Sequence, residues 1–194
     1  MENLSLLPAV QKFVTDLRTA CAEGLEGEAR WERCRDLMKV MLADPELKAH
    51  AENWPVCGFD GKRVGNLLFY VDPDYGFALN GLIKNAGGRA MVHDHGPSWT
   101  VYGVLRGTER IVRFEVAEEN GEKELRESWD VICGPGDIDI VPPGEIHSEF
   151  AQDQKSIAFI VRSQKTGTFD QLSFEGGPEG VSHPGPEQIP YELN

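Results

Sequence analysis

A series of short apolar segments, separated by Gly, Pro, Asp and Asn, fills the middle of the chain and limits the folds open to it. Short strands at regular spacing, with turn residues between them, are typical of a β-sandwich, a jelly roll or a small barrel. We therefore expect an all-β core. The expected strands cover residues 66–71, 77–83, 90–95, 100–105, 110–116, 128–133, 137–141, 147–150 and 156–161.

The first part of the chain has a different pattern. Apolar residues such as Val10, Phe13 and Leu17 recur at the spacing of an amphipathic helix. A glycine-rich break and then Asp44-Pro45 divide this region into helical pieces. At 194 residues the chain is expected to form a single domain. Its expected parts are a helical segment over residues 1–55, a barrel over 56–165 and an extended, Gly/Pro-rich C-terminal arm over 166–194.

The charge of the chain bears on its partners. Lys and Arg number 19 and Asp and Glu 32, which gives a net charge of −13. Nucleic acids and anionic membranes are bound through basic faces, so neither is an expected partner. No apolar run reaches the length of about 20 residues that spans a bilayer, and the first residues lack the features of a signal peptide. Scattered cysteines without a CxxC pair indicate free thiols, and we expect a cytoplasmic location.

Three histidines are the candidate functional residues. His93 and His95 lie one residue apart in an expected strand, which places both imidazoles on the same face. His147 follows the stiff corner Pro142-Pro143-Gly144 and enters another expected strand. Three imidazoles that converge inside a barrel can bind one divalent ion and leave other coordination positions open. The sequence therefore predicts a metal site made by these three side chains.

The spacing around these histidines is that of a known signature. Gly88 lies five positions before His93, five residues separate Gly136 from the Pro142-Pro143-Gly144 corner, and two residues separate this corner from His147. The two halves match the cupin signature, and the chain resembles cupins over roughly residues 66 to 163. The resemblance implies a cupin double-stranded β-helix, a jelly-roll barrel, preceded here by the helical segment.

One departure from the cupin pattern points to a subgroup. Cupins commonly carry a glutamate ligand three or four residues after the second histidine, where this chain has Trp99 and Thr100. A three-histidine site is usual in cysteine dioxygenase-type thiol dioxygenases, which the chain resembles in its helical N-terminal part and in residues 92–96 and 103–107. The resemblance implies Fe(II), which adds both atoms of O₂ to a thiol and gives a sulfinate. Imidazole also binds Zn, Ni or Mn.

Some features of that subgroup are missing. The chain has no cysteine to form the Cys–Tyr crosslink near Thr100, no Ser-His-Tyr run around residues 158–164 and no arginine on the early strand 66–71. The substrate is therefore expected to be a small anionic thiol other than free cysteine, or another oxidisable anion.

Five other residues are candidates for the same site. Arg89 shares strand parity with His93 and can bind a substrate carboxylate through two hydrogen bonds, unless it pairs with a carboxylate at the rim. Tyr102 is the candidate catalytic hydroxyl, or an interior aromatic residue bonded to the protein. Trp99 is expected to line the pocket, and Arg162 to contact the anion. Glu149 shares parity with His147 and can orient a ligand histidine, or serve a structural role.

Two other functions remain open at this point. A three-histidine cupin also suits a metal-dependent enzyme with a carbon substrate: a carbon–carbon cleaving dioxygenase, a lyase or an isomerase. The third possibility is a cupin that binds a small molecule without turnover. The partners expected are a small-molecule substrate and O₂, and a homodimer is possible because cupins often pair through barrel strands.

Overall fold

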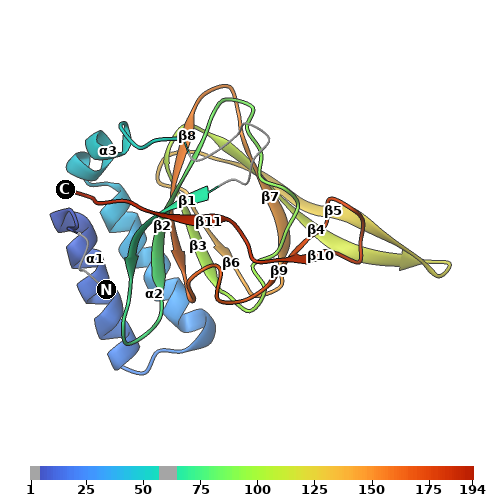
Figure 1. Ribbon diagram of the computed structural model, residues 1–194, viewed down its shortest axis with the longest axis horizontal. Coiled ribbons are helices and arrows are strands. Elements are labelled where there is room, and N and C mark those ends of the chain that lie inside the picture. Colours follow the sequence, from blue (N-terminus) through green and yellow to red (C-terminus); the bar gives the residue numbers. More distant parts are fainter. Residues whose placement is uncertain (1–4, 57–64) are drawn as a thin grey trace.

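The computed structural model describes residues 5–56 and 65–194, and its helices are where the sequence predicts them. They are α1 (Pro8–Ala22), α2 (Gly27–Leu42) and α3 (Pro45–Ala51). Figure 1 shows the three helices together on one side of the larger sheet. Asp44 begins α3 by accepting a hydrogen bond from Leu47 N at 2.8 Å, and Pro45 occupies the first turn, where its missing N–H costs nothing.

The β part of the chain confirms the expectation of an all-β core. A six-stranded sheet has the order β11-β1-β2-β8-β3-β6, a three-stranded sheet has the order β5-β4-β7, and β10 pairs with β9. The strands are β1 (Gly65–Val71), β2 (Ala78–Lys84), β3 (Thr100–Arg106), β4 (Glu109–Glu119), β5 (Glu122–Cys133), β6 (Ile138–Val141), β7 (Ile146–Ala151), β8 (Ser156–Arg162), β9 (Gln171–Ser173), β10 (Val181–His183) and β11 (Glu187–Pro190).

The order of the strands is that of a double-stranded β-helix. Between β2 and β8 the chain passes back and forth between two facing sheets: β2, β3, β6 and β8 belong to the larger one, and β4, β5 and β7 to the smaller. Apart from β4 and β5, strands that follow one another in sequence between β2 and β8 do not pair with each other, and β8 lies between β2 and β3. This interleaved antiparallel arrangement defines a jelly roll.

The segment that carries two of the histidines is less regular than predicted. The expected strand over residues 90–95 is wrong as a regular strand, because this segment forms isolated bridges with β7, Arg89↔Phe150 and His93↔His147, and no continuous ladder. His93 and His147 exchange two backbone hydrogen bonds of 2.9 Å. The segment thus runs beside β7 as an irregular edge of the smaller sheet, and it turns away at Gly96, whose φ is 51°.

The larger sheet buries both of its faces. Val101, Leu105, Phe159 and Val161 belong to the cluster that contains the helical core residues. The alternate residues of the same strands, among them Tyr102 and Ile160, form a second cluster between the two sheets. A residue of β3 or β8 is thereby assigned to the helical side or to the barrel interior by its parity alone.

The C-terminal arm returns across the barrel and is more structured than its Gly/Pro-rich composition predicts. It contains β9, β10 and β11, and β11 pairs in parallel with β1 from Gly65↔Glu187 to Leu68↔Pro190. Leu193 N then donates a 3.0 Å hydrogen bond to Ser5 O, so that the end of the chain lies beside α1 (Figure 1).

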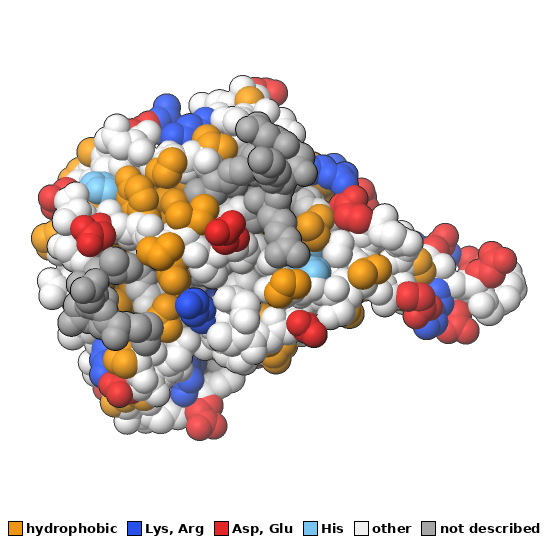
Figure 2. All heavy atoms as spheres, viewed as in Figure 1, with side chains coloured by type: hydrophobic (Ala, Val, Ile, Leu, Met, Phe, Trp, Pro, Cys, Tyr) orange, Lys and Arg blue, Asp and Glu red, His pale blue; other side chains and the backbone are white. Residues whose placement is uncertain are grey.

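The hairpin of β4 and β5 projects from the barrel (Figure 1). Figure 2 shows acidic and basic side chains gathered on its outer part, which is consistent with a solvated surface. No helix in the described ranges is long and apolar enough to cross a membrane.

Candidate metal centre

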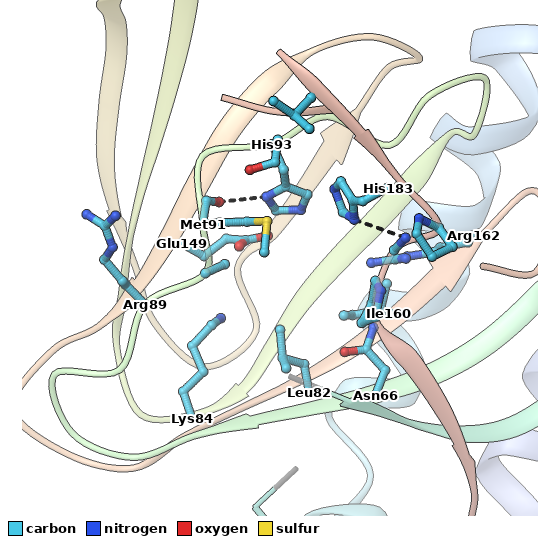
Figure 3. Close-up of a pocket in the computed structure, with 16 residues that line it drawn as sticks. Asn66, Leu82, Lys84, Arg89, Met91, His93, Glu149, Ile160, Arg162 and His183 are labelled. Atoms are coloured by element: carbon cyan, nitrogen blue, oxygen red, sulfur yellow. Dashed lines mark hydrogen bonds between the residues drawn. The ribbon is translucent and has the colours of Figure 1, made fainter. Parts of the chain in front are cut away.

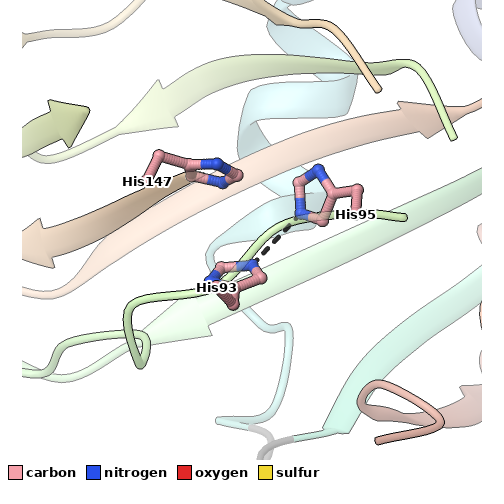
Figure 4. A group of neighbouring side chains, drawn as sticks. All are labelled: His93, His95 and His147. Carbon is pink, nitrogen blue, oxygen red and sulfur yellow. Dashed lines mark hydrogen bonds between the residues drawn. The ribbon is translucent and has the colours of Figure 1, made fainter. Parts of the chain in front are cut away.

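The three predicted histidines meet inside the barrel. His93 and His95 come from the edge segment of the smaller sheet and His147 from β7 beside it. Their ring centroids are 4.6 to 4.9 Å apart. One nitrogen from each ring lies within 4.8 Å of the other two. Figure 4 shows the three rings gathered together. All three side chains are buried, at 9 % or less of their full exposure.

Backbone carbonyls orient two of the rings. Nδ1 of His93 donates to Met91 O at 2.8 Å, and Nδ1 of His147 lies 3.2 Å from Glu145 O. A neutral imidazole whose Nδ1 carries the proton has its lone pair on Nε2. Both contacts therefore direct Nε2 toward the centre of the cluster, which is how proteins commonly fix a metal-binding imidazole.

The cluster has the spacing and protonation that a metal ion needs. Nε2 of His93 and Nε2 of His95 are 3.2 Å apart. Two nitrogen ligands about 2.1 Å from one ion are separated by about 3.0 to 3.4 Å, for angles between square and tetrahedral. The buried Nδ1 of His95 has no hydrogen-bond partner among the described residues, so the protein does not otherwise use this ring. The histidines thus fit a divalent ion.

Burial keeps the first two histidines neutral. Desolvation, and then the charge that His147 can carry, lower the pKa of His93 to about 3. Desolvation and then Arg162 lower the pKa of His95 well below its usual value. Both imidazoles are therefore unprotonated near neutral pH, as metal ligands must be.

Glu149 is next to the cluster, but not in the position expected. Its Oε1 lies 3.2 Å from Nε2 of His147, the nitrogen that faces the other two rings, and not beside Nδ1. Burial by itself lowers the pKa of His147, yet Glu149, the Glu145 carbonyl and Asp139 together raise that pKa above its usual value. Burial likewise tends to raise the pKa of Glu149, and His147 and Lys84 lower it overall.

A cavity of about 300 Å³ lies beside the cluster, and His93 is the histidine of the three that lines it. Figure 3 shows His93 and Glu149 on one side of it and Arg162 on the other. Its walls are mostly apolar, and a part of the C-terminal arm, residues 181–186, closes one side. The cavity can hold a small organic molecule within reach of the histidines.

The structure brings some of the other candidates to this cavity. Arg162 lines it and is 4 % exposed. Arg89 also lines it, but at the rim: the side chain is 50 % exposed, and Nη2 donates to both carboxylate oxygens of Glu175 at 2.7 Å. In Figure 3 its guanidinium points away from the histidines. Arg89 is thus an arginine at the rim of the barrel that pairs with a carboxylate, the alternative to binding substrate.

Two candidates do not line the cavity. Trp99 is partly buried against the cluster of apolar residues on the helical side of the sheet. Tyr102 is in the barrel interior, where its hydroxyl donates to Glu109 Oε2 at 2.7 Å and accepts from Lys84 Nζ at 2.7 Å. Desolvation and then Glu109 raise the pKa of Tyr102 well above its usual value. Protein groups engage this hydroxyl, and its role in catalysis stays a prediction.

Sequence reasoning missed several residues of the cavity. Asn66 and Lys84 lie on strands that were predicted, but nothing in their local sequence marks them as facing a site. The arm residues could not be found from spacing, because the pairings of β10 with β9 and of β11 with β1 bring them to the cavity. The place of Arg162 at the end of the last expected barrel strand was the available signal for it.

Comparisons with known proteins complete the description. No family model matches the sequence, and no curated protein matches it significantly. Similar solved structures include the Schizosaccharomyces pombe Cnp3 cupin domain, with 14 % identity and a TM-score of 0.41 over 52 % of this chain and 64 % of that one. A Klebsiella pneumoniae protein with a double-stranded β-helix domain has 16 % identity and a TM-score of 0.43 over 61 % of this chain and 84 % of that one.

An oxalate oxidase in complex with glycolate gives 16 % identity and a TM-score of 0.42 over 56 % of this chain and 55 % of that one. This chain thus spans less than two thirds of the oxalate oxidase and of the Cnp3 domain. The strand order, and not these likenesses, carries the assignment of the fold. Fold and site together define a jelly-roll protein with a three-histidine candidate metal centre.

Proposed function

We propose that the protein is a mononuclear non-haem iron dioxygenase that oxidises a small anionic thiol to its sulfinate. The observation that carries the proposal is the convergence of His93, His95 and His147 beside a cavity that His93 lines. Three neutral ligands leave an ion its positive charge, which suits a thiolate. Fe(II) would bind the thiolate and activate O₂; Zn, Ni and Mn are the alternative ions.

The reaction is balanced without another reductant. One thiol and one O₂ give one sulfinic acid, both oxygen atoms end on sulfur, and the sulfur supplies the four electrons. The protein residues would bind the substrate and keep water out. Leu82 and Ile160 give the cavity apolar walls, and Arg162 places a cation in it. The Glu149 carboxylate can accept the proton that the thiol releases.

The test is O₂ uptake by protein purified without oxygen and reconstituted with Fe(II). The substrates are cysteine, 3-mercaptopropionate, cysteamine and mercaptosuccinate. We expect one sulfinate per O₂ consumed, and loss of both in His93→Ala. His50→Gln is the matched control, because His50 lies outside the cavity beside Trp54. Full iron occupancy without O₂ uptake for any thiol would reject the proposal.

Glu149 favours a second candidate, a metal-dependent enzyme with a carbon substrate. A buried carboxylate next to the metal-facing nitrogen of His147 can accept a proton from carbon, as lyases and isomerases require. Analysis of products separates the two candidates, because a sulfinate supports the first, and an isomerised or cleaved carbon chain supports the second. Metal and ligand bound without turnover would support a binding protein.

A further inference from the structure

We propose that the substrate carries a hydroxyl group, and that this hydroxyl binds between Lys84 and Glu149. Lys84 would donate a hydrogen bond to the hydroxyl oxygen, and Glu149 Oε2 would accept a hydrogen bond from the hydroxyl. This hydroxyl site deepens the proposed function and rests on it, because the thiol of the same molecule would face the histidines.

Glu149 has an acceptor that the protein leaves unused. Its side chain lines the cavity, and the residue is 4 % exposed. Oε1 lies 3.2 Å from Nε2 of His147, whereas the buried Oε2 has no hydrogen-bond partner in the described ranges. A buried carboxylate oxygen without a donor costs free energy, so this position favours a ligand that brings one. A thiol proton taken up at Oε1 would leave Oε2 as an acceptor.

Lys84 has an unused donor in the same cavity. Its side chain is 1 % exposed and lines the cavity. Nζ lies 2.7 Å from the Tyr102 hydroxyl and 2.8 Å from Glu109 Oε2, and these are its hydrogen-bond partners among the described residues. An ammonium group has three N–H donors, so one N–H is left for a ligand.

The ladder of the smaller sheet brings this donor close to Glu149. Glu149 on β7 pairs with Ile111 on β4, and Glu109 lies two residues from Ile111 on the same face. Such diagonal neighbours are about 7 to 8 Å apart. Lys84 reaches Glu109 from β2 in the facing sheet, yet within residues 5–56 and 65–194 it forms no ion pair with Glu149. Figure 3 shows the amine of Lys84 directed toward the part of the cavity where Glu149 lies, so a small group can bind between them.

A hydroxyl group matches this pair better than a charged group does. It accepts one hydrogen bond and donates another, as the two residues require. A carboxylate has no hydrogen for Glu149 and is repelled by its charge, and an ammonium group has no lone pair for Lys84 and is likewise repelled. Leu82 and Ile160, which also line the cavity, are apolar and suit the carbon atoms of the substrate.

The test compares four thiols by their binding to the Co(II) protein without O₂, followed in the visible spectrum, where a bound thiolate is seen directly. 2-Mercaptoethanol and 1-propanethiol differ in the hydroxyl alone. 2-Methoxyethanethiol and 1-butanethiol are a second pair, in which the oxygen carries no hydrogen. We expect 2-mercaptoethanol to bind about tenfold or more tightly than 1-propanethiol, and the ether to gain less over 1-butanethiol.

Three results would overturn the proposal. Equal binding within the first pair would mean that the hydroxyl gains nothing, as when a fixed water molecule already bridges Lys84 and Glu149. An equal gain in both pairs would mean that Glu149 accepts no hydrogen bond from the hydroxyl. Lack of 2-mercaptoethanol binding would reject the site altogether. The dioxygenase proposal is judged separately, because O₂ uptake by the Fe(II) protein with another thiol does not depend on a hydroxyl.

A double variant then assigns the donor. Lys84→Met with Glu109→Leu removes the donor together with its counter-ion, so that no unpaired charge remains to unfold the protein. It should lose most of the preference for 2-mercaptoethanol and bind 1-propanethiol as before. Arg89→Met is the control, because Arg89 is a cation of the same cavity that Glu175 holds at the rim. A full preference kept in the double variant would reject the role of Lys84, and the comparison of the four thiols stands without any variant.

Discussion

Glu149 and His147 lie two residues apart on β7, and Oε1 of the first is 3.2 Å from Nε2 of the second. Both side chains have the same parity and point into the barrel, where each is almost fully buried. Since Nδ1 of His147 faces the carbonyl of Glu145, the carboxylate sits at the nitrogen that a metal ion would use. A cation, either a proton or a metal ion, must lie between two such acceptors.

This relationship predicts that Glu149→Gln weakens metal binding. The substitution keeps the shape of the side chain but removes the negative charge nearest to the ion. We expect the dissociation constant for Zn(II) or Co(II) to rise by about 10- to 100-fold, the usual effect of losing a group that supports a metal ligand. Competition with a chelator at pH 7.5 measures it, and the visible spectrum of the Co(II) protein reports any change in coordination.

Glu127→Gln is the matched control, because Glu127 is an exposed carboxylate on β5, and its side chain is 57 % exposed. It should leave the dissociation constant and the Co(II) spectrum unchanged. If Glu149→Gln binds Zn(II) as tightly as the unmodified protein does, Glu149 does not act on the ion.

Most of the fold could be predicted because it depends on local patterns. Turn residues between apolar segments located β1 to β8, and the boundaries agree to within a few residues except in the hairpin. There β4 and β5 extend to Glu119 and Glu122, well beyond the apolar residues, because two strands joined by a tight turn stabilise each other through backbone hydrogen bonds. The arm strands were missed because a Gly/Pro-rich sequence carries no apolar alternation.

The candidate site was predictable in part, for a similar reason. The histidines stand at fixed spacings from turn residues, so the sequence locates them. Whether Arg89, Tyr102 and Trp99 face the cavity depends on contacts between distant segments. Glu175 holds Arg89 at the rim, and Glu109 and Lys84 engage Tyr102. No local pattern contains these partners, which are 86, 7 and 18 residues away from the residues they bind.

Lys84, Tyr102 and Glu109 form a buried polar triad, and we predict that Lys84→Met unfolds more easily. Lys84 Nζ is 2.8 Å from Glu109 Oε2, and the two side chains are 1 % and 0 % exposed. Loss of the lysine leaves the carboxylate buried with the Tyr102 hydroxyl as its remaining partner, which costs about 3 to 5 kcal/mol of unfolding free energy. Urea denaturation followed by circular dichroism measures the loss.

The double variant Lys84→Met, Glu109→Leu checks the cause. It removes both charges, so it should recover much of the lost stability. A double variant less stable than Lys84→Met would mean that packing, and not the unpaired carboxylate, causes the effect.

Gly107, in the turn between β3 and β4, is predicted to tolerate no side chain. Its φ is +75°, and a Cβ there would lie 2.5 Å from the backbone oxygen of Lys155. Gly121, in the turn between β4 and β5, has a φ of +83° but nothing within 4 Å of a Cβ. Gly121→Ala should therefore lower the free energy of unfolding only by the cost of the left-handed conformation, about 1 to 2 kcal/mol. Gly107→Ala should lower it further, because its Cβ also meets the backbone of Lys155. Equal melting temperatures for the two variants would contradict the backbone clash.

Cys133 should react slowly with alkylating agents, and at a rate that depends on pH. Burial, and then the nearby carboxylates of Asp139 and Asp137, raise its pKa to about 11. The thiolate is the reactive form, so a pKa of 11 leaves about one thiolate in a thousand at pH 8, compared with about a quarter for an ordinary thiol. The rate of modification by iodoacetamide should rise about tenfold per pH unit between pH 7.5 and 9.5.

Mass spectrometry of the peptide that contains Cys133 measures this rate without interference from other cysteines. Cys34 is the internal control: it is 0 % exposed, and burial raises its pKa further than that of Cys133. It should stay unmodified until the protein unfolds. If Cys133 reacts at pH 8 as fast as free cysteine, this end of β5 opens to solvent. The thiol would then not stay buried beside Asp139.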